Sequence, residues 1–130
     1  MNNQLEQLIM MSRLAMEQAY APYSNFRVGV AVLGESGRIY SGCNVENASY
    51  GLSICAERVA IFNAVCSGER IIKAVVISNS SGKPAFPCGA CRQVMSEFTT
   101  APQDLEICLV GDSGVESYTL AELLPNAFRL

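Results

Sequence analysis

The fold prediction depends on two stretches of the sequence, Cys55-Ala56-Glu57-Arg58 and Pro87-Cys88-Gly89-Ala90-Cys91-Arg92. The second stretch holds two thiols at C-x2-C spacing, and the first adds a third thiol with a carboxylate two residues later. Three protein ligands leave one position of a tetrahedral zinc open for water, whereas a structural zinc site is closed by a fourth Cys or His. The sequence therefore predicts a catalytic zinc site, one per subunit, with Cys55, Cys88 and Cys91 as its ligands.

The chain contains no histidine, so Ser-His-Asp and Cys-His mechanisms are excluded and any metal site is built from thiolates and carboxylates. The alternative for the three cysteines is a structural zinc site or plain buried thiols. Glu57 stands at the start of an expected helix, where we expect it to face the metal without binding it and to act as the proton carrier. Its alternative is an ordinary carboxylate at a helix start. The remaining cysteines, Cys43, Cys66 and Cys108, are predicted to be core residues.

Both cysteine stretches fall where a loop enters an expected helix, so free backbone N–H groups and a helix dipole point at the thiols and lower their pKa. Three thiolates on one divalent zinc leave a net charge of about −1, which weakens the zinc as a Lewis acid. We therefore predict that Arg58 and Arg92 donate hydrogen bonds to the sulfurs and offset this charge. A solvated surface charge is the alternative for Arg58.

Composition narrows the class of protein. The chain has 130 residues, which predicts a single domain over residues 1–130. Half of the residues are hydrophobic and only 16% are charged, so we expect a homo-oligomer that buries part of this surface. The net charge is −3 and the nine Lys and Arg residues form no stripe, which disfavours nucleic acid as partner and favours a small, nearly neutral substrate. No apolar run approaches the roughly 18 residues of a membrane span and no signal peptide is recognised, so we expect no membrane partner and a cytoplasmic location.

Hydrophobic periodicity predicts helices and strands that alternate after an initial hairpin. We expect Ser53 to cap the second helix. This pattern is typical of the α/β class and predicts a three-layer α/β/α domain with a mixed five-stranded sheet. The expected helices are residues 3–20, 55–66 and 89–99 with a helical turn at 120–124, and the expected strands are residues 26–33, 38–43, 71–78, 105–110 and 116–118.

The two cysteine stretches resemble those of the small, homotetrameric, zinc-dependent type in the cytidine and deoxycytidylate deaminase family. The resemblance extends over nearly the whole chain, because residues 21–29, 42–50 and 123–128 are also similar to sequence blocks of that family. It implies the cytidine deaminase-like fold and the hydrolytic deamination of cytidine and 2'-deoxycytidine to the uridines, with release of ammonia, as in pyrimidine salvage. The tail, which ends in Asn126-Ala127-Phe128-Arg129-Leu130, differs slightly from the usual glycine-containing form.

The resemblance also implies how the nucleoside is bound. Asn44 and Glu46 would hydrogen-bond the ribose hydroxyls, which agrees with their spacing: residues two apart on an extended segment project to the same side. The side chain at Phe26 would pack on the pyrimidine ring. The full set of implied substrate-binding residues is Phe26, Asn44, Glu46, Ala56 through its backbone, and Tyr50 and Phe128 from neighbouring subunits. From the residues alone, Asn44 and Glu46 are also explained as loop caps and Phe26 as a core aromatic.

Three other functions fit parts of the sequence. A related deaminase of a cytosine-nucleoside antibiotic is the nearest alternative, although Phe26, Asn44 and Glu46 favour the plain nucleoside. Editing of RNA or DNA requires a basic groove and an aromatic stacking platform, which the sequence does not show. A non-catalytic interaction module stabilised by zinc is the alternative from another class. No cluster of Lys or Arg surrounds residues 44–53, so we expect no recognition of a 5'-phosphate.

Overall fold

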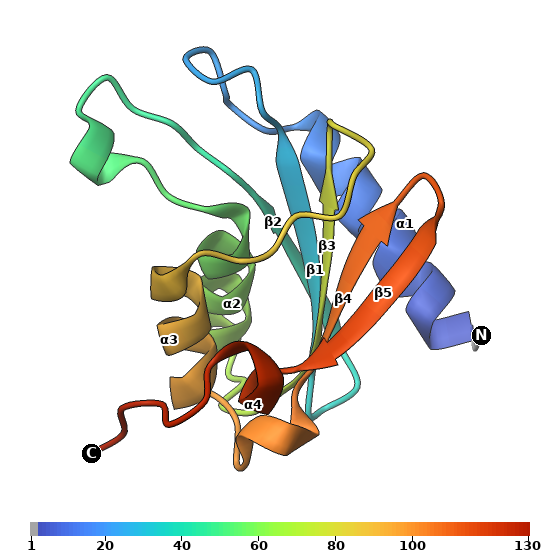
Figure 1. Cartoon of the computed structure of the whole chain (residues 1–130), viewed down its shortest axis with the longest axis vertical. Coiled ribbons are helices and arrows are strands. Elements are labelled where there is room, and N and C mark those ends of the chain that lie inside the picture. The colour runs from blue at the N-terminus through green and yellow to red at the C-terminus, as the bar shows by residue number, and fades with distance from the viewer. Residues whose placement is uncertain (1–2) are drawn as a thin grey trace.

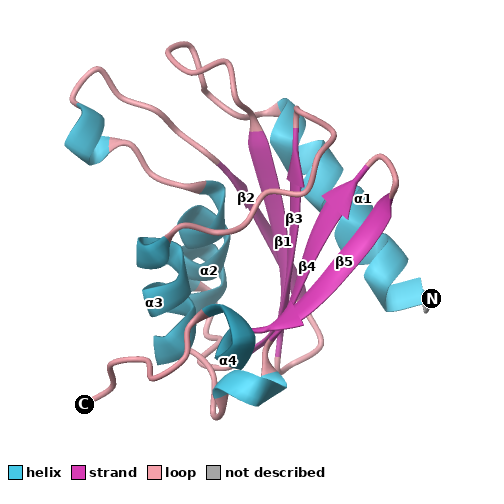
Figure 2. Ribbon diagram, viewed as in Figure 1, coloured by secondary structure: helices cyan, strands magenta, loops and turns pink. Residues whose placement is uncertain are grey.

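A mixed sheet of five strands forms the middle layer of the computed structural model, which describes residues 3–130 (Figure 1). Helix α1 covers one face of the sheet, and α2, α3 and α4 lie on the other side (Figure 2). The expected three-layer α/β/α arrangement is therefore confirmed. The elements in chain order are α1 (Asn3–Glu17), β1 (Val28–Gly34), β2 (Ile39–Cys43), the 3-10 helix η1 (Tyr50–Leu52), α2 (Ala56–Cys66), β3 (Ile72–Asn79), α3 (Gly89–Glu97), the 3-10 helix η2 (Pro102–Asp104), β4 (Glu106–Gly111), β5 (Gly114–Thr119) and α4 (Leu120–Leu123).

The strands lie in the order β2-β1-β3-β4-β5. Strand β1 is antiparallel to both β2 and β3, and β4 is antiparallel to β5. Only the β3–β4 pair is parallel, and parallel neighbours require a crossover connection, which α3 supplies. The predicted mixed five-stranded sheet is confirmed, and the strand expected to be interior, β3, occupies the central position.

Alternating side chains of the strands build a separate core on each face of the sheet. Along β1, Val30 and Val32 are buried in the cluster that also contains residues of α2 and α3. Ala31, between them in the sequence, belongs to the cluster on the side of α1, together with Leu8. The buried strands thus fix the positions of α1 and α2 against opposite faces.

Two glycines allow these helices to approach the sheet closely. A Cβ atom on Gly29 of β1 would lie 2.0 Å from the carbonyl oxygen of Ser12 in α1. On Gly42 of β2, a Cβ atom would lie 2.5 Å from the backbone nitrogen of Ala60 in α2. Because real Cβ atoms do not approach backbone this closely, Gly42 sets how near the start of α2 lies to the sheet.

The structure corrects two expectations, that Cys66 belongs to the core and that Ser53 caps α2. Cys108 is buried and Cys43 is partly buried, but Cys66 is exposed, so its assignment to the core is wrong. Cys66 is the last residue of α2, and its side chain is not among the buried residues of that helix. Ser53 does not cap α2 either, because it ends the short helix η1, and the N-cap position of α2 is taken by Cys55. Within residues 3–130, no helix combines the length and the apolar character that crossing a membrane demands.

Candidate metal centre and active site

The three predicted zinc ligands come together at the starts of two helices. Cys55 occupies the N-cap of α2, Cys88 occupies the N-cap of α3, and Cys91 lies buried in the first turn of α3. All three Sγ atoms lie within 4.8 Å of one another, and Cys88 Sγ is 3.8 Å from Cys55 Sγ and 3.4 Å from Cys91 Sγ. Zinc–sulfur bonds of about 2.3 Å in a tetrahedral site place two sulfurs about 3.8 Å apart. The cluster therefore fits one zinc ion.

The surroundings of the cluster favour thiolates. Neither helix start has a side-chain cap, so its free backbone N–H groups face the thiols. Hydrogen bonds to Cys55 from Cys91 and from Arg58 lower the pKa of Cys55 to about 5 despite its partial burial. The pKa of Cys91 is raised, because it shares that hydrogen bond with Cys55 and is buried. Cys55 is therefore the thiol of this pair that ionises first.

Arg58 contacts the cluster directly. Its Nη2 atom donates a hydrogen bond to Cys55 Sγ over 3.4 Å. Among the residues that the structure describes, the buried Nε atom of the same guanidinium has no hydrogen-bond partner. An unpaired buried N–H beside a group of thiols is costly unless a charge nearby accepts from it. The N–H groups of Arg58 beside the cluster are thus suited to sulfurs that carry negative charge.

Arg92 does not play the part predicted for it. Its Nε atom donates to the carbonyl oxygen of Pro87 over 2.7 Å, and Nη1 donates to the carbonyl oxygen of Leu123, also over 2.7 Å. Consecutive residues of a helix point about 100° apart, so the residue after buried Cys91 faces away from the metal site. The prediction that Arg92 donates to the sulfurs is wrong, and the side chain instead fastens α3 to α4.

Glu57 stands in the first turn of α2 with only 6% of its surface exposed. Burial, with a smaller contribution from the nearby charge of Cys55, raises the pKa of Glu57 to about 7. A carboxyl group with a pKa near neutrality exchanges protons readily in both directions, which is the property that a proton carrier requires.

Glu57 and two of the cysteines line a pocket of about 200 Å³. The pocket also brings together Phe26, Asn44 and Ala56, which the sequence had predicted as neighbours of a substrate. Phe86, which the prediction missed, belongs to the lining as well, and its ring packs on Tyr118 with centroids 5.1 Å apart. An aromatic residue two positions before Cys88 was the available signal. The complete lining is Phe26, Val28, Asn44, Cys55, Ala56, Glu57, Ile77, Ala85, Phe86 and Cys88.

Asn44 directly follows β2 and is buried beside the start of β1, where its side-chain amide makes two hydrogen bonds to the backbone. Its Oδ1 atom accepts from Val28 N over 2.9 Å, and its Nδ2 atom donates to the carbonyl oxygen of Phe26 over 2.8 Å. An amide side chain has two donor hydrogens and two acceptor lone pairs. One of each therefore remains for a ligand, while the bonds made to the backbone hold Phe26 in place.

Glu46 lies outside the pocket lining, on the loop between β2 and α2. Its Oε1 atom accepts from the backbone N–H groups of Tyr23 and Ser24, over 3.0 and 3.1 Å, and its Oε2 atom accepts from the hydroxyl of Ser24. These bonds lower the pKa of Glu46, the side-chain bond from Ser24 having the largest effect. The carboxylate is thus ionised and fixed in direction, with one lone pair of Oε2 still unused.

Tyr50 and Phe128 do not reach the pocket of their own chain. Tyr50 is 78% exposed on η1, which extends away from the sheet, and Phe128 is 68% exposed near the C-terminus (Figure 1). Tyr50 contacts the ring of Tyr23 edge-on, with centroids 6.5 Å apart. Gln93 in α3 donates from Nε2 to the carbonyl oxygen of Phe128 over 3.0 Å, which holds the tail against α3.

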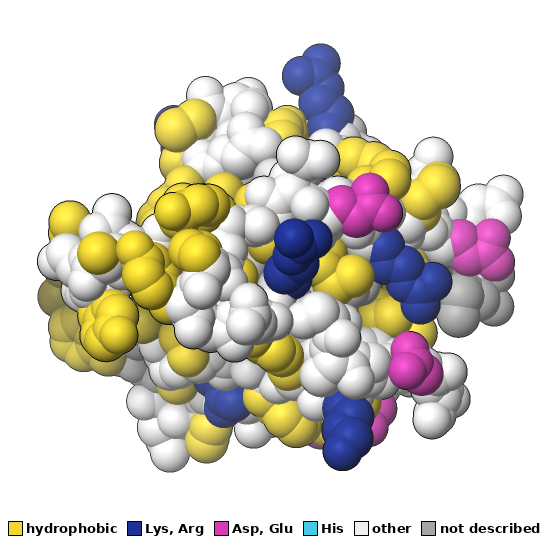
Figure 3. Space-filling model, turned by 90° about the horizontal axis from the view of Figure 1, so that it is seen from above, with side chains coloured by type: hydrophobic (Ala, Val, Ile, Leu, Met, Phe, Trp, Pro, Cys, Tyr) yellow, Lys and Arg dark blue, Asp and Glu magenta, His cyan; other side chains and the backbone are white. Residues whose placement is uncertain are grey.

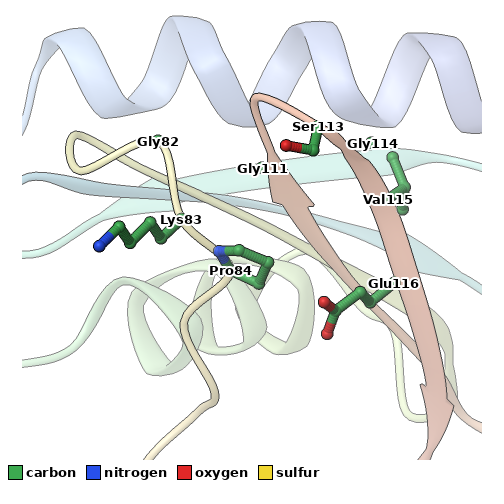
Figure 4. Close-up of a pocket in the computed structure, with 8 residues that line it drawn as sticks. All are labelled: Gly82, Lys83, Pro84, Gly111, Ser113, Gly114, Val115 and Glu116. Carbon is green, nitrogen blue, oxygen red and sulfur yellow. The ribbon is translucent and has the colours of Figure 1, made fainter.

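A second cavity, of about 380 Å³, is larger but offers no comparable chemistry. It lies beside the turn between β4 and β5, and its lining contains no thiol and two charged side chains, Lys83 and Glu116. The two side chains lie apart, with Pro84 between them (Figure 4). The smaller pocket above the cysteines is therefore the candidate active site.

Three thiols without a histidine would leave the fourth position of a bound zinc to water, which is the ligand arrangement of a catalytic zinc site. The chain belongs to the cytidine and deoxycytidylate deaminase family, because residues 2–103 match the family model described as the cytidine and deoxycytidylate deaminase zinc-binding region. It is similar to the cytidine deaminase of Sporosarcina psychrophila, with 49% identity over 125 residues that cover 95% of this chain and 90% of the relative. The cytidine deaminase of Halalkalibacterium halodurans is 47% identical over 88% of this chain and 86% of its own.

Solved structures agree with this assignment. The crystal structure of the cytidine deaminase from Burkholderia pseudomallei is 45% identical and superimposes with a TM-score of 0.88 over 98% of this chain and all of its own. That of the cytidine deaminase from Mycobacterium tuberculosis gives a TM-score of 0.85 at 36% identity, over 99% of this chain and 100% of its own. The predicted fold, the predicted zinc and the assignment to hydrolytic enzymes are confirmed.

Proposed function

We propose that this enzyme hydrolyses cytidine and 2'-deoxycytidine to uridine and 2'-deoxyuridine, with release of ammonia. The observation that carries the proposal is the buried carboxyl group of Glu57 beside the thiol cluster, in one pocket with Phe26 and Asn44. The names of the relatives support a cytosine nucleoside as substrate. The reaction consumes one water for each cytidine and gives one uridine and one ammonia.

Each residue at the centre has a defined task in this proposal. Cys55, Cys88 and Cys91 hold the zinc as thiolates, and zinc, when bound, supplies a water whose pKa is low enough for attack at neutral pH. Glu57 accepts the proton of the attacking water and passes it to the pyrimidine ring nitrogen beside the amino-bearing carbon. It then takes the proton of the hydroxyl group added to that carbon and delivers it to the amino group, so that the C–N bond breaks and ammonia leaves as a neutral molecule. Its raised pKa suits both directions of transfer.

The rest of the pocket orients the nucleoside. The ring of Phe26, 38% exposed, offers a flat apolar surface for the pyrimidine, and the backbone of Ala56 offers polar groups to the base. Asn44 offers its remaining amide hydrogen and lone pair to the ribose hydroxyls. Glu46 offers the unused lone pair of Oε2 as a charged acceptor for one hydroxyl.

A homotetramer completes the site in this proposal, with Tyr50 and Phe128 reaching pockets of neighbouring subunits. Both rings are exposed and held away from their own pocket, and exposed hydrophobic side chains gather at the side of the molecule that carries η1 and α2 (Figure 3). Lys and Arg are scattered over the face in Figure 3 without forming a stripe, which agrees with a small substrate and not a nucleic acid. We place the enzyme in the cytoplasm because its metal-binding thiols have to stay reduced, as that compartment keeps them.

One absorbance assay tests the function. The zinc-loaded protein is mixed separately with cytidine, 2'-deoxycytidine, cytosine and cytidine 5'-monophosphate, and loss of the cytosine absorbance is followed together with ammonia release. We expect turnover of the two nucleosides and little or none of the other two compounds, since free cytosine leaves Asn44 and Glu46 without partners. Failure to turn over either nucleoside would contradict the proposal.

A further inference from the structure

Ser24 lies in the exposed turn between α1 and β1, and its hydroxyl joins two residues assigned to the substrate. The Oγ atom donates its proton to Oε2 of Glu46. The same oxygen accepts a hydrogen bond from the backbone N–H of Phe26 over 3.0 Å. A hydroxyl has one donor and two acceptor sites. Its only proton is therefore committed to the carboxylate, while a lone pair holds the backbone of the residue that faces the pyrimidine.

The surrounding contacts join the same two loops. The loop that carries Ser24 and the loop that carries Glu46 extend toward the same end of the molecule (Figure 1). The backbone N–H of Glu46 donates to the carbonyl oxygen of Tyr20 over 2.9 Å, and the backbone N–H of Ser24 donates to Oε1 of Glu46 over 3.1 Å. The backbone bonds set the position of the carboxylate, but within residues 3–130 only the hydroxyl of Ser24 donates to Oε2, the oxygen that retains an unused lone pair.

We propose that Ser24 is a positioning residue for sugar recognition, which turns Oε2 of Glu46 toward a ribose hydroxyl and couples that carboxylate to the place of Phe26. This inference rests on the proposed function, in which Glu46 reads the sugar and Phe26 packs on the base. Ser24 contacts no reacting atom in this scheme. It acts on the affinity for the sugar hydroxyls and leaves proton transfer at Glu57 unchanged.

The test compares Ser24→Ala with the wild-type holoenzyme on two substrates, cytidine and 2',3'-dideoxycytidine. The second lacks the hydroxyls that Glu46 would read. Loss of a hydrogen bond to a charged group weakens binding by about tenfold or more. We expect KM for cytidine to rise by about tenfold with kcat little changed, and KM for the dideoxy compound, which is affected only through the lost bond to the backbone of Phe26, to rise by clearly less. Ser24→Thr keeps the hydroxyl, and we expect it to retain most of the wild-type preference.

Ser80→Ala is the matched control. The hydroxyl of Ser80 also accepts a backbone N–H beside Phe26, that of Arg27 over 3.0 Å, but no bond joins Ser80 to Glu46. We expect its preference between the two substrates to equal that of the wild type. An unchanged melting temperature of Ser24→Ala shows that the variant is folded, as expected for an exposed turn.

Two kinetic outcomes overturn the inference. If Ser24→Ala weakens cytidine and the dideoxy compound equally, Ser24 only shapes the loop, and if it changes neither, Ser24 does not position Glu46. Calorimetric binding of the products uridine and 2',3'-dideoxyuridine separates this inference from the proposed function, because it needs no turnover. The role of Ser24 is supported, even if cytidine is not deaminated, when the wild-type protein binds uridine more tightly than 2',3'-dideoxyuridine and Ser24→Ala does not. Equal wild-type binding of the two products contradicts it.

Discussion

Arg58 and Arg92 are the last residues of the two cysteine stretches, yet of these two side chains only that of Arg58 donates to a sulfur. Replacement of Arg58 by Gln removes the positively charged group that donates to Cys55 Sγ. Loss of a side chain that hydrogen-bonds a metal ligand typically lowers the affinity for the metal by about 10- to 100-fold. We expect Arg58→Gln to lower the affinity for zinc by about tenfold, measured by competition with a chromogenic chelator.

Arg92→Gln is the control, because the hydrogen bonds of Arg92 go to the carbonyl oxygens of Pro87 and Leu123. We expect this variant to melt at a lower temperature, through loss of the contact between α3 and α4, while its zinc affinity stays within about twofold of the wild type, since no bond to a sulfur is lost. Equal zinc affinity in Arg58→Gln and the wild type would show that Arg58 does not support the thiolates.

Glu57→Gln tests the proton carrier. The amide keeps the shape of the side chain and leaves all three thiols in place, but it cannot accept the proton of the attacking water. General acid–base groups contribute about 10²- to 10⁴-fold to a rate. We expect kcat to fall by at least that factor, while elemental analysis still finds one zinc per chain.

Glu6→Gln is the matched control for that variant, because Glu6 also stands in the first turn of a helix but is exposed on α1. We expect it to retain wild-type kcat and zinc content. Loss of zinc together with activity in Glu57→Gln would instead make Glu57 a structural residue of the metal site.

The sequence predicted the grouping of Cys55, Cys88 and Cys91 because their spacing and helix-start positions are local properties. It did not separate Arg58 from Arg92, because which of two nearby arginines turns toward the sulfurs depends on the direction in which each leaves its helix. Phe86 was missed for a related reason. Its place in the pocket is set by packing on Tyr118 of β5, which is far away in the sequence.

At the scale of elements, Gly42 determines how closely α2 approaches β2, and α2 begins directly after Cys55. A methyl group there has to displace the helix, since it would meet backbone atoms and not the end of a flexible side chain. Overpacking of this kind costs about 1–3 kcal/mol. We expect Gly42→Ala to lower the free energy of unfolding by that amount or more in urea titrations and to weaken zinc binding.

Gly29→Ala provides the comparison, because it forces apart β1 and α1 on the opposite face. We expect a similar loss of stability, but no loss of zinc affinity in the folded protein. Gly51→Ala, where an added Cβ atom meets nothing within 4 Å, should match the wild type in both measurements. If Gly29→Ala and Gly42→Ala weakened zinc binding equally, the position of α2 would not be the cause.

Glu69 connects the turn of the β1–β2 hairpin to the end of α2. Its buried carboxylate accepts from the hydroxyl of Ser36, from Ser36 N over 3.3 Å and from the hydroxyl of Tyr40 over 2.8 Å. These bonds, with that of the Ser36 side chain the largest, hold the pKa of Glu69 below its ordinary value of 4.5. A lowered carboxyl pKa stabilises the fold above the unfolded value and loses that effect as the pH falls through the folded value.

We therefore expect Glu69→Gln to melt at a lower temperature than the wild type at pH 7, and this difference to shrink as the pH falls below 4.5. Glu35→Gln, an exposed change in the same turn, corrects for loss of zinc in acid, which affects every variant alike. A difference between Glu69→Gln and the wild type that stays constant with pH would show that ionisation of Glu69 is not involved.

The order and type of the elements were predictable because the strands are rich in β-branched residues and because α1 and α3 have a clear apolar period. Boundaries were less predictable where tertiary contacts decide them. Residues 18–20 were expected to continue the first helix, but Tyr20 leaves α1 and bonds through its backbone to Asn44 and Glu46. Cys66 follows the helical pattern, yet it is exposed as the last residue of α2.

At the scale of the whole molecule, one part of the exposed hydrophobic surface lies on α2, η1 and the C-terminal tail. Its most exposed large members, besides Tyr50 and Phe128, include Leu52, which is 70% exposed. Leu52 is not among the residues that line the candidate active site of its own chain, so we expect a change there to act on activity through neighbouring copies. A side chain this exposed on a segment that extends from the body is well placed to be covered by a second subunit.

Leu52→Asp therefore tests the proposed homotetramer. Burial of an unpaired carboxylate in an apolar interface costs several kcal/mol, enough to separate subunits at micromolar concentration. We expect sedimentation equilibrium to give the mass of a tetramer for the wild type and a smaller species for Leu52→Asp. Turnover of cytidine should fall with dissociation, because Tyr50 and Phe128 no longer reach a neighbouring pocket. Met10→Asp, on the exposed side of α1 across the sheet, should remain tetrameric and active. A wild-type protein that sediments as a monomer with full activity would exclude shared active sites.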